Sequence, residues 1–401
     1  GGIILETGTT SAGSSGSVAI ATGSALGGHG GHISMSVGDG TTGEGGHVSV
    51  TAGSTSDSRA GGFISLDTGY SSETSSGAFS VHTANAGSLG TSGSIALQTG
   101  TSSDGNSGTL SLLSGSATGG AGGSILFSVG AGDTGPGGDI NMLAGDALAD
   151  AAIGGKVTIR AGAGRSSHFA DGGNGGAVEV VGGAAMGGSV DRDHGGIVSI
   201  AGGPARRGRG GNVIIGSGAS ATSSSGHVQL FTANAGQAGT SGTIDLATGR
   251  STKGNSGGIQ LSTGPAMQGR AGGIALVVGN GDTGNGGDIV AMAGRTTDSH
   301  GRGGSVQVSS GRSLHTSSGE VVIGSSNAGI RGTSGRLHLS TGTSSHGASG
   351  TVSLVSGGAV GGAGGHVNIG VGAGDTAQTP FVGGAHGVAA GTSGSSPSHG
   401  R

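Results

Sequence analysis

A seven-residue segment recurs along the whole chain and restricts its fold more than any other feature. The clearest copy is Ser94–Gly100, which reads S-I-A-L-Q-T-G and follows the pattern x-h-x-h-x-x-G, where h is apolar. Because side chains alternate between the two faces of a strand, Ile95, Leu97 and Thr99 are expected on one face and their neighbours on the other. The pattern predicts a half-buried β-strand that is closed by a glycine.

The segment usually returns after 15 or 16 residues, and 24 intact copies are present. The second and fourth positions of these copies are all Val, Ile, Leu, Met or Phe, with Ala291 as the single exception. Such columns argue against a disordered Gly/Ser linker. The copies begin at Gly2, Ser17, His32, His47, Phe63, Ala78, Ser94, Thr109, Ser124, Asp139, Lys156, Ala177, Ile197, Asn212, His227, Thr243, Gly258, Gly273, Asp288, Ser305, Glu320, Arg336, Thr351 and His366.

The connections between segments show a second level of order. Copies preceded by Ser-Gly and copies preceded by Gly-Gly alternate in triplets of about 46 residues, and two triplets make a super-repeat of 92 or 93 residues. The middle super-repeat carries one extra triplet. Longer loops are expected at 146–155, 163–176 and 184–196, a degenerate last copy at 385–391 and a C-terminal tail at 392–401.

One unit has too few apolar side chains to fold alone, so the units are expected to stack. The prediction is an all-β, parallel β-solenoid (β-helix) that runs continuously over residues 1–391 and consists of 24 strand-loop units. Two windings stay open. In the one that we favour, each unit is one flat coil; in the other, three units make one turn around a shared core.

Composition excludes several classes of function. The net charge is −4, only 9% of residues are charged and 2% are aromatic, which argues against nucleic-acid binding. No apolar run approaches the roughly 20 residues of a transmembrane segment. Cysteine is absent. With 103 glycines, G-x-S-x-G and glycine-rich matches arise by composition, so we expect no catalytic residue, no cofactor site and no enzyme.

Metal binding rests on weak candidates only. The turns that read G-D-T-G-x-G-G-D each place two carboxylates nearby, and these loosely resemble calcium-binding β-roll repeats. Two outward histidines could share a transition metal in the flat winding. The alternative is that the aspartates are turn formers and the histidines are solvated. The candidates are Asp133, Asp139, Asp282, Asp288, His32 and His47.

The wording of the repeats, for example Asn85-Ala86-Gly87, Thr91–Leu97 and Gly130–Gly135, resembles that of Gly/Ser/Thr-rich tandem-repeat proteins of marine microalgae. The resemblance covers nearly the whole chain. It implies a secreted or cell-surface protein, and it brings no assigned activity and no functional residues.

We therefore expect a structural repeat protein that self-associates into a rod or filament of an extracellular appendage, cell covering or matrix. Exposed Ser/Thr corners are candidate acceptors for O-linked glycan. The alternatives are a binding surface, either ice-binding or adhesive, and a calcium-stabilised β-roll. Threonine recurs at the sixth position of the segment, as in Thr99 and Thr248, but this position is expected to point inward.

Overall fold

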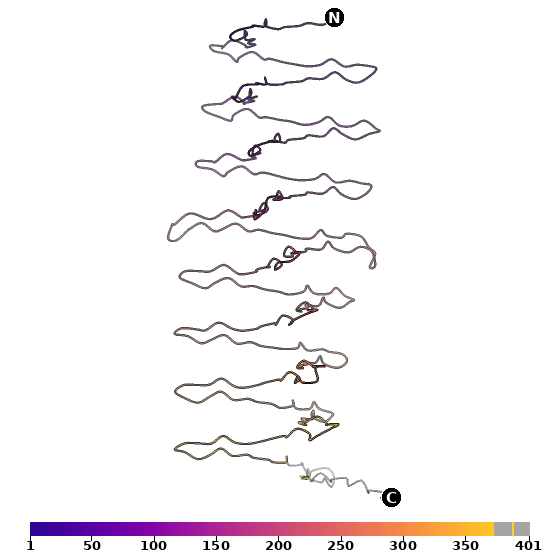
Figure 1. The fold of residues 1–401 in the computed structure, drawn as a ribbon, viewed down its shortest axis with the longest axis vertical. Helices are drawn as coiled ribbons and strands as arrows, with labels where there is room; N and C mark the ends of the chain where they lie inside the picture. Colours follow the sequence, from indigo (N-terminus) through magenta and orange to yellow (C-terminus); the bar gives the residue numbers. More distant parts are fainter. Residues whose placement is uncertain (373–386, 389–401) are drawn as a thin grey trace. The chain divides into compact units, whose positions relative to one another are not determined.

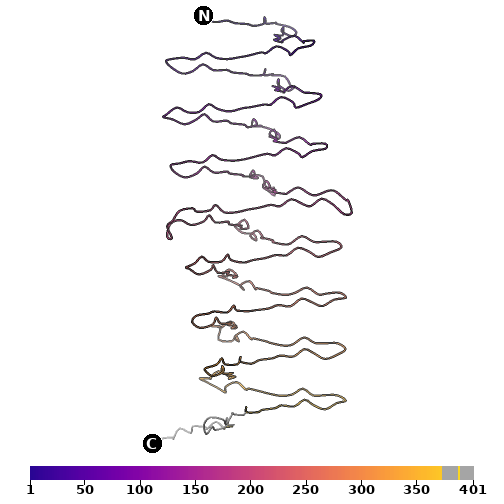
Figure 2. The same cartoon turned by 180° about the vertical axis from the view of Figure 1, so that it is seen from behind.

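The computed structural model describes residues 1–372 and 387–388. The chain divides into two units, one from Gly1 to Val213 and one that begins at Ile214. Within each unit the ribbon alternates between drawn-out passes and reversals at glycine-rich loops (Figures 1 and 2). Of the degenerate last copy at 385–391 only Gly387 and Val388 are described, and the tail at 392–401 lies outside the described residues.

The expected all-β, parallel β-solenoid or β-helix is wrong, because the described residues contain no strand and no helix (Figure 1). Backbone hydrogen bonds within residues 1–372 join parts of a single loop. An example is Gly77, whose N–H donates to the carbonyl of Gly69 at 3.0 Å. In this part of the chain none of them joins one segment to another. Neither of the two expected windings is therefore formed.

The accessible surface gives the physical reason. The chain exposes 40183 Å². A folded monomer of this size exposes roughly 14,000 Å² and an unfolded chain roughly 53,000 Å². None of the described residues is buried. Since each unit offers two apolar columns to a long, glycine-rich backbone, the peptide groups of the segments stay with water instead of pairing with each other.

The predicted alternation of faces is nevertheless visible in the exposure of neighbouring side chains. In the segment 124–130, Ile125 and Phe127 are 49% and 66% exposed, whereas Leu126 between them is 86% exposed. The large apolar side chains of the later segments follow the same order, with the even positions more sheltered than the odd ones, but in the first segment Ile3 at position two is 99% exposed and Ile4 at position three is 82% exposed. Positions two and four therefore form an inward face, although no described residue covers it completely.

The loops between segments fall into two types. In amide-closed loops, the N–H of the last glycine donates to the carbonyl of the first glycine at 2.8–3.0 Å. In glycine-turn loops, a residue within the loop has a positive φ and this closing bond is not formed; the amide-closed loop 145–155 also contains a residue of positive φ, Ala151 at +58°. The amide-closed loops are 53–62, 69–77, 145–155, 162–176, 183–196, 203–211, 218–226, 294–304 and 311–319. The glycine-turn loops are 8–16, 23–31, 38–46, 84–93, 100–108, 115–123, 130–138, 233–242, 249–257, 264–272, 279–287, 326–335, 342–350 and 357–365.

Loops that are equivalent in the super-repeat have the same geometry. In one set, Gly13, Gly105, Gly254 and Gly347 have φ of +94°, +105°, +99° and +101°. In each loop of this set, a Ser or Thr hydroxyl donates to the carbonyl of the residue before the glycine, at 2.8–3.2 Å. That residue is Ala12, Asp104, Lys253 or His346. The turn is therefore constant, while its tip changes in charge from copy to copy.

Gln268 breaks this regularity and provides a test of loop strain. It has φ +61° where the equivalent Gly27, Gly119 and Gly361 have φ +80°, +80° and +81°. A side chain costs about 1–2 kcal/mol in the left-handed region. We expect Gln268→Gly to raise the population of the native turn about fivefold or more, as measured by NMR couplings and order parameters of residues 266–270. Met267→Gly, at a neighbouring position without a positive φ, is the control and should loosen the turn. Equal behaviour of the two variants would contradict the strain.

Candidate functional site

The acidic candidates lie on two equivalent glycine-turn loops and on the segments that follow them. Asp133 and Asp282 precede turn glycines with φ +89° and +74°, and Asp139 and Asp288 begin the next segments. All four are exposed. Thr134 donates its hydroxyl to Asp133 at 3.4 Å, which is the local contact expected of a turn former. Over the described residues, no three His, Asp or Glu side chains converge to hold a cation.

The two histidine candidates are also exposed. His32 and His47 begin consecutive segments that are separated by the loop 38–46. In the described part of the chain neither belongs to a group of three or more potential ligands. Calcium at the acidic turns and a metal shared by these histidines therefore stay sequence-based predictions.

The longest inserted loop, 162–176, is closed twice. Gly176 N–H donates to the carbonyl of Gly162 at 2.9 Å at its base, and Gly173 N–H donates to Ser166 at 3.4 Å farther out. Beyond this second closure, Asp171 N–H donates to Nδ1 of His168 at 3.2 Å. The tip thereby presents Phe169, an aromatic side chain that is fully exposed.

The next inserted loop, 183–196, is held by a carboxylate. Ser189 N–H donates to Oδ2 of Asp193 at 2.7 Å, and Asp193 N–H donates back to the Ser189 carbonyl at 3.1 Å. A Cβ on Gly187 would overlap the same carboxylate, so a larger residue there would require the Asp193 side chain to move. The loop presents the exposed apolar residues Met186 and Val190.

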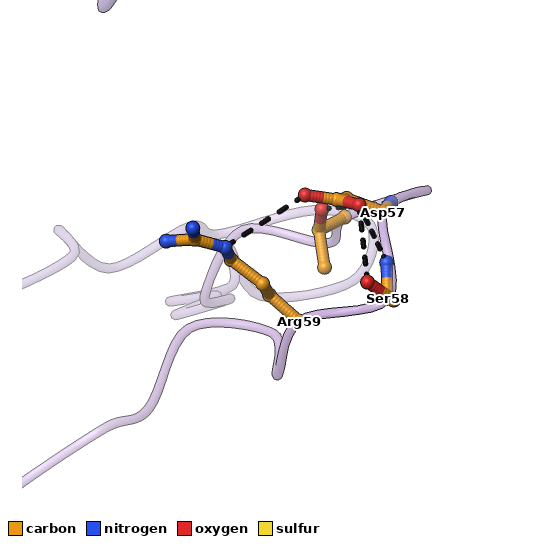
Figure 3. Close-up of polar contacts among 4 residues, drawn as sticks. Asp57, Ser58 and Arg59 are labelled. Carbon is orange, nitrogen blue, oxygen red and sulfur yellow. Dashed lines mark hydrogen bonds and ion pairs between the residues drawn. The ribbon is translucent and has the colours of Figure 1, made fainter.

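A charged tip recurs on the loops 53–62 and 294–304. In the first, Thr55 Oγ1 accepts the Asp57 N–H at 3.1 Å, and the Asp57 carboxylate lies 3.9 Å from Nε of Arg59 (Figure 3). In the second, the Asp298 N–H donates to Oγ1 of Thr296 at 3.1 Å. The Asp298 carboxylate lies 4.0 Å from Nδ1 of His300. These side chains are well exposed, so such contacts orient the tip and contribute little stability.

Sequence reasoning missed a hydroxyl cluster in the amide-closed loops 69–77 and 311–319. The hydroxyl of Ser313 accepts the N–H groups of His315 and Thr316 at 3.3 and 2.9 Å, and it lies 3.0 Å from the Thr316 hydroxyl. Ser71 and Thr74 repeat these contacts at equivalent positions. The signal in the sequence is the recurring S-x-x-T, which is typical of a Ser/Thr turn.

This cluster yields a testable prediction. Ser313→Ala removes the acceptor of two N–H groups, each bond contributing about 0.5–1.5 kcal/mol. We expect the amide of Thr316 to show the temperature dependence of a free amide by NMR. Ser317→Ala, next to the cluster in the same loop, should leave the Thr316 amide unchanged. An unchanged Thr316 amide in Ser313→Ala would show that the cluster does not hold the loop.

An apolar hollow lies on the inward face of two consecutive segments. It has a volume of about 380 Å³ and is lined by Phe127, Ile140, Asn141 and Met142. Phe127 and Met142 are fourth-position residues of the segments 124–130 and 139–145, and Ile140 is a second-position residue, whereas Asn141 is at the third position, on the outward face. The inward faces of neighbouring segments therefore share an uncovered apolar space.

No protein-family model, curated protein or solved structure matches the chain. Among the described residues, no helix is long and apolar enough to cross a membrane.

Proposed function

We propose that the chain is a structural protein whose copies self-associate into an extracellular filament, appendage, cell covering or matrix. The observation that carries the proposal is the periodic exposure of the inward face. Side chains such as Ile95 and Leu97 recur in unit after unit and remain 53% and 67% exposed. Soluble monomers rarely expose contiguous apolar patches larger than a few hundred Å². Because this apolar face recurs with each unit, a partner whose own apolar positions recur with the same spacing would fit it best.

Another copy of the chain has this property. Its second and fourth positions recur with the same spacing, so one copy offers another a matching apolar face along its length. The hollow at Phe127 and Met142 is one place where a side chain of a neighbouring copy would find an apolar lining. Burying apolar surface contributes roughly 25 cal/mol per Å², so many small contacts add up over the repeats.

The extracellular location rests on the resemblance to repeat proteins of marine microalgae. Exposed loop hydroxyls such as Ser103 and Ser345 are candidate sites for O-linked glycan on the assembled surface.

A binding surface is the second candidate, and one observation favours its adhesive form. The doubly closed loop 162–176 holds the exposed Phe169 beyond a hydrogen-bonded base. The ice-binding form receives less support, because several threonine hydroxyls at the sixth position of the segment already donate hydrogen bonds to loop carbonyls. Thr7, Thr22 and Thr248 donate to the carbonyls of Gly16, Gly31 and Gly257 at 3.2–3.3 Å.

Electron microscopy of native material and sedimentation of the purified chain test the structural role. Long polymers, together with association that rises with protein concentration, are the expected results. A chain that stays monomeric at every concentration would overturn the proposal. If the variant Phe169→Ser no longer attaches to a surface but still forms polymers, the adhesive function is favoured.

A further inference from the structure

Asparagine side chains that precede glycine are the ones most open to attack by the backbone. The attacking group is the nitrogen of the next residue, and glycine carries no side chain that would hinder its approach. Of the 11 asparagines in the chain, three precede glycine. These are Asn174, Asn280 and Asn285, and all three are exposed. Two of them share one glycine-turn loop, 279–287, which reads G-N-G-D-T-G-N-G-G.

The loop 279–287 leaves both attacking nitrogens free. In the described part of the chain, the N–H groups of Gly281 and Gly286 donate to no backbone carbonyl. A Cβ built on Gly286 would meet no atom within 4 Å, and one built on Gly281 would come no closer than 3.8 Å to the carbonyl oxygen of Thr283. The backbone after each asparagine therefore has room to turn toward the side-chain amide.

The third asparagine, Asn174, is held more firmly in the loop 162–176. The glycines on either side of the Asn174–Gly175 dipeptide donate their N–H groups across the loop at 3.4 and 2.9 Å. A Cβ on Gly164, in the opposite arm, would lie 2.6 Å from the Asn174 nitrogen, so the two arms are in close contact. The same dipeptide is therefore less able to reorient here than in the loop 279–287.

The equivalent loop 38–46 already carries carboxylates at the two positions in question. Asp39 and Glu44 stand where the later loop has its two asparagines. The turn glycines of the two loops have φ +80° and +74°. This turn therefore accepts a negative charge at both positions without a change of type.

We propose that the loop 279–287 is a site of spontaneous deamidation, which converts Asn280 and Asn285 to aspartate or isoaspartate. The nitrogen of the following glycine loses its proton to water and bonds to the side-chain carbonyl carbon, while the bond from that carbon to the amide nitrogen breaks and ammonia leaves. Water then adds to either carbonyl of the resulting imide ring and opens it.

The reaction changes the charge of this loop and needs no partner other than water. Opening at the side-chain carbonyl gives aspartate, and opening at the backbone carbonyl gives isoaspartate. Since either carboxyl is ionised at neutral pH, each conversion adds one negative charge to a chain whose net charge is −4. The loop 279–287 thereby acquires the acidic residues that the loop 38–46 has from the start, whether or not the chain self-associates.

Incubation of the purified chain in neutral buffer, followed by mass spectrometry of its peptides, tests the site. The peptide that holds Asn280 and Asn285 should show two exchanges of NH₂ for OH, contain isoaspartate and release ammonia. The peptide that holds Asn174 should change more slowly. Amides at Asn280 and Asn285 that persist as long as the one at Asn174 would overturn the proposal.

Two alanine variants test the part played by the attacking nitrogen. Gly281→Ala should slow the loss at Asn280 about fivefold or more, because a side chain on the attacking residue restricts its approach; Asn285 in the same chain is the internal reference. Gly279→Ala is the matched control, since a Cβ there meets no atom within 4 Å and its φ is not positive. It precedes Asn280 and should leave both rates unchanged. Equal rates at Asn280 in the two variants would also overturn the proposal.

Discussion

Replacing Gly202 with alanine is expected to open the loop 203–211. A Cβ at Gly202 would overlap the carbonyl oxygen of Gly211, the residue whose N–H closes the loop onto Gly203 at 2.9 Å. Such an overlap costs about 1–3 kcal/mol. The closing hydrogen bond contributes about 0.5–1.5 kcal/mol. The overlap exceeds the bond over most of these ranges, so we expect the closed loop to become the minor form.

The measurement is the exchange rate and temperature dependence of the Gly211 amide by NMR, which should become those of a free amide in Gly202→Ala. The neighbouring Gly203→Ala is a matched control. A Cβ at Gly203 meets no atom within 4 Å, and its φ is not positive. A Gly211 amide that behaves alike in both variants would contradict the close approach of the loop ends.

The second large effect is expected from the inward face. Ile125→Ser combined with Phe127→Ser removes two side chains that a neighbouring copy would cover. Since each is already partly sheltered, the loss is about 1 kcal/mol per side chain. We expect the concentration needed for assembly to rise about thirtyfold, as measured by light scattering.

Leu126→Ser is the control for this pair, because Leu126 lies between the two residues on the outward face. It removes as large an apolar side chain from the same segment. A rise of the assembly concentration equal to that of the double variant would show that general hydrophobicity, and not the inward face, drives association.

The periodic features of the structure follow from the sequence, whereas strand pairing does not. The alternation at Ile125, Leu126 and Phe127 depends only on neighbouring residues, and the pattern indicated it correctly. Pairing between segments requires side chains that shield the glycine-rich backbone from water. Each unit has only two apolar columns, and none of the described residues is buried. The prediction of a β-solenoid failed at this step.

The geometry of the loops is also only partly predictable from the sequence. The sequence indicates a turn at 38–46, but Gly43 alone takes a positive φ there while Gly40 and Gly45 do not. Composition cannot distinguish these glycines. The candidate sites depend on such detail: Asp133 and Asp139 are close in sequence, yet they join no cluster of three ligands in the described chain. The hydroxyl cluster at Ser71 and Thr74 has a signal in the sequence, the recurring S-x-x-T, but the sequence does not give its contacts.

Residue-resolved hydrogen exchange on the dilute, unassembled chain tests the central claim most directly. Within residues 1–372 the segments form no backbone hydrogen bonds with each other, whereas the ends of the amide-closed loops bond to each other. The predicted result is therefore rapid exchange throughout segments such as 94–100 and slower exchange at Gly62, Gly77, Gly211 and Gly319, the closing glycines. Protection of the segment amides that does not depend on protein concentration would contradict it.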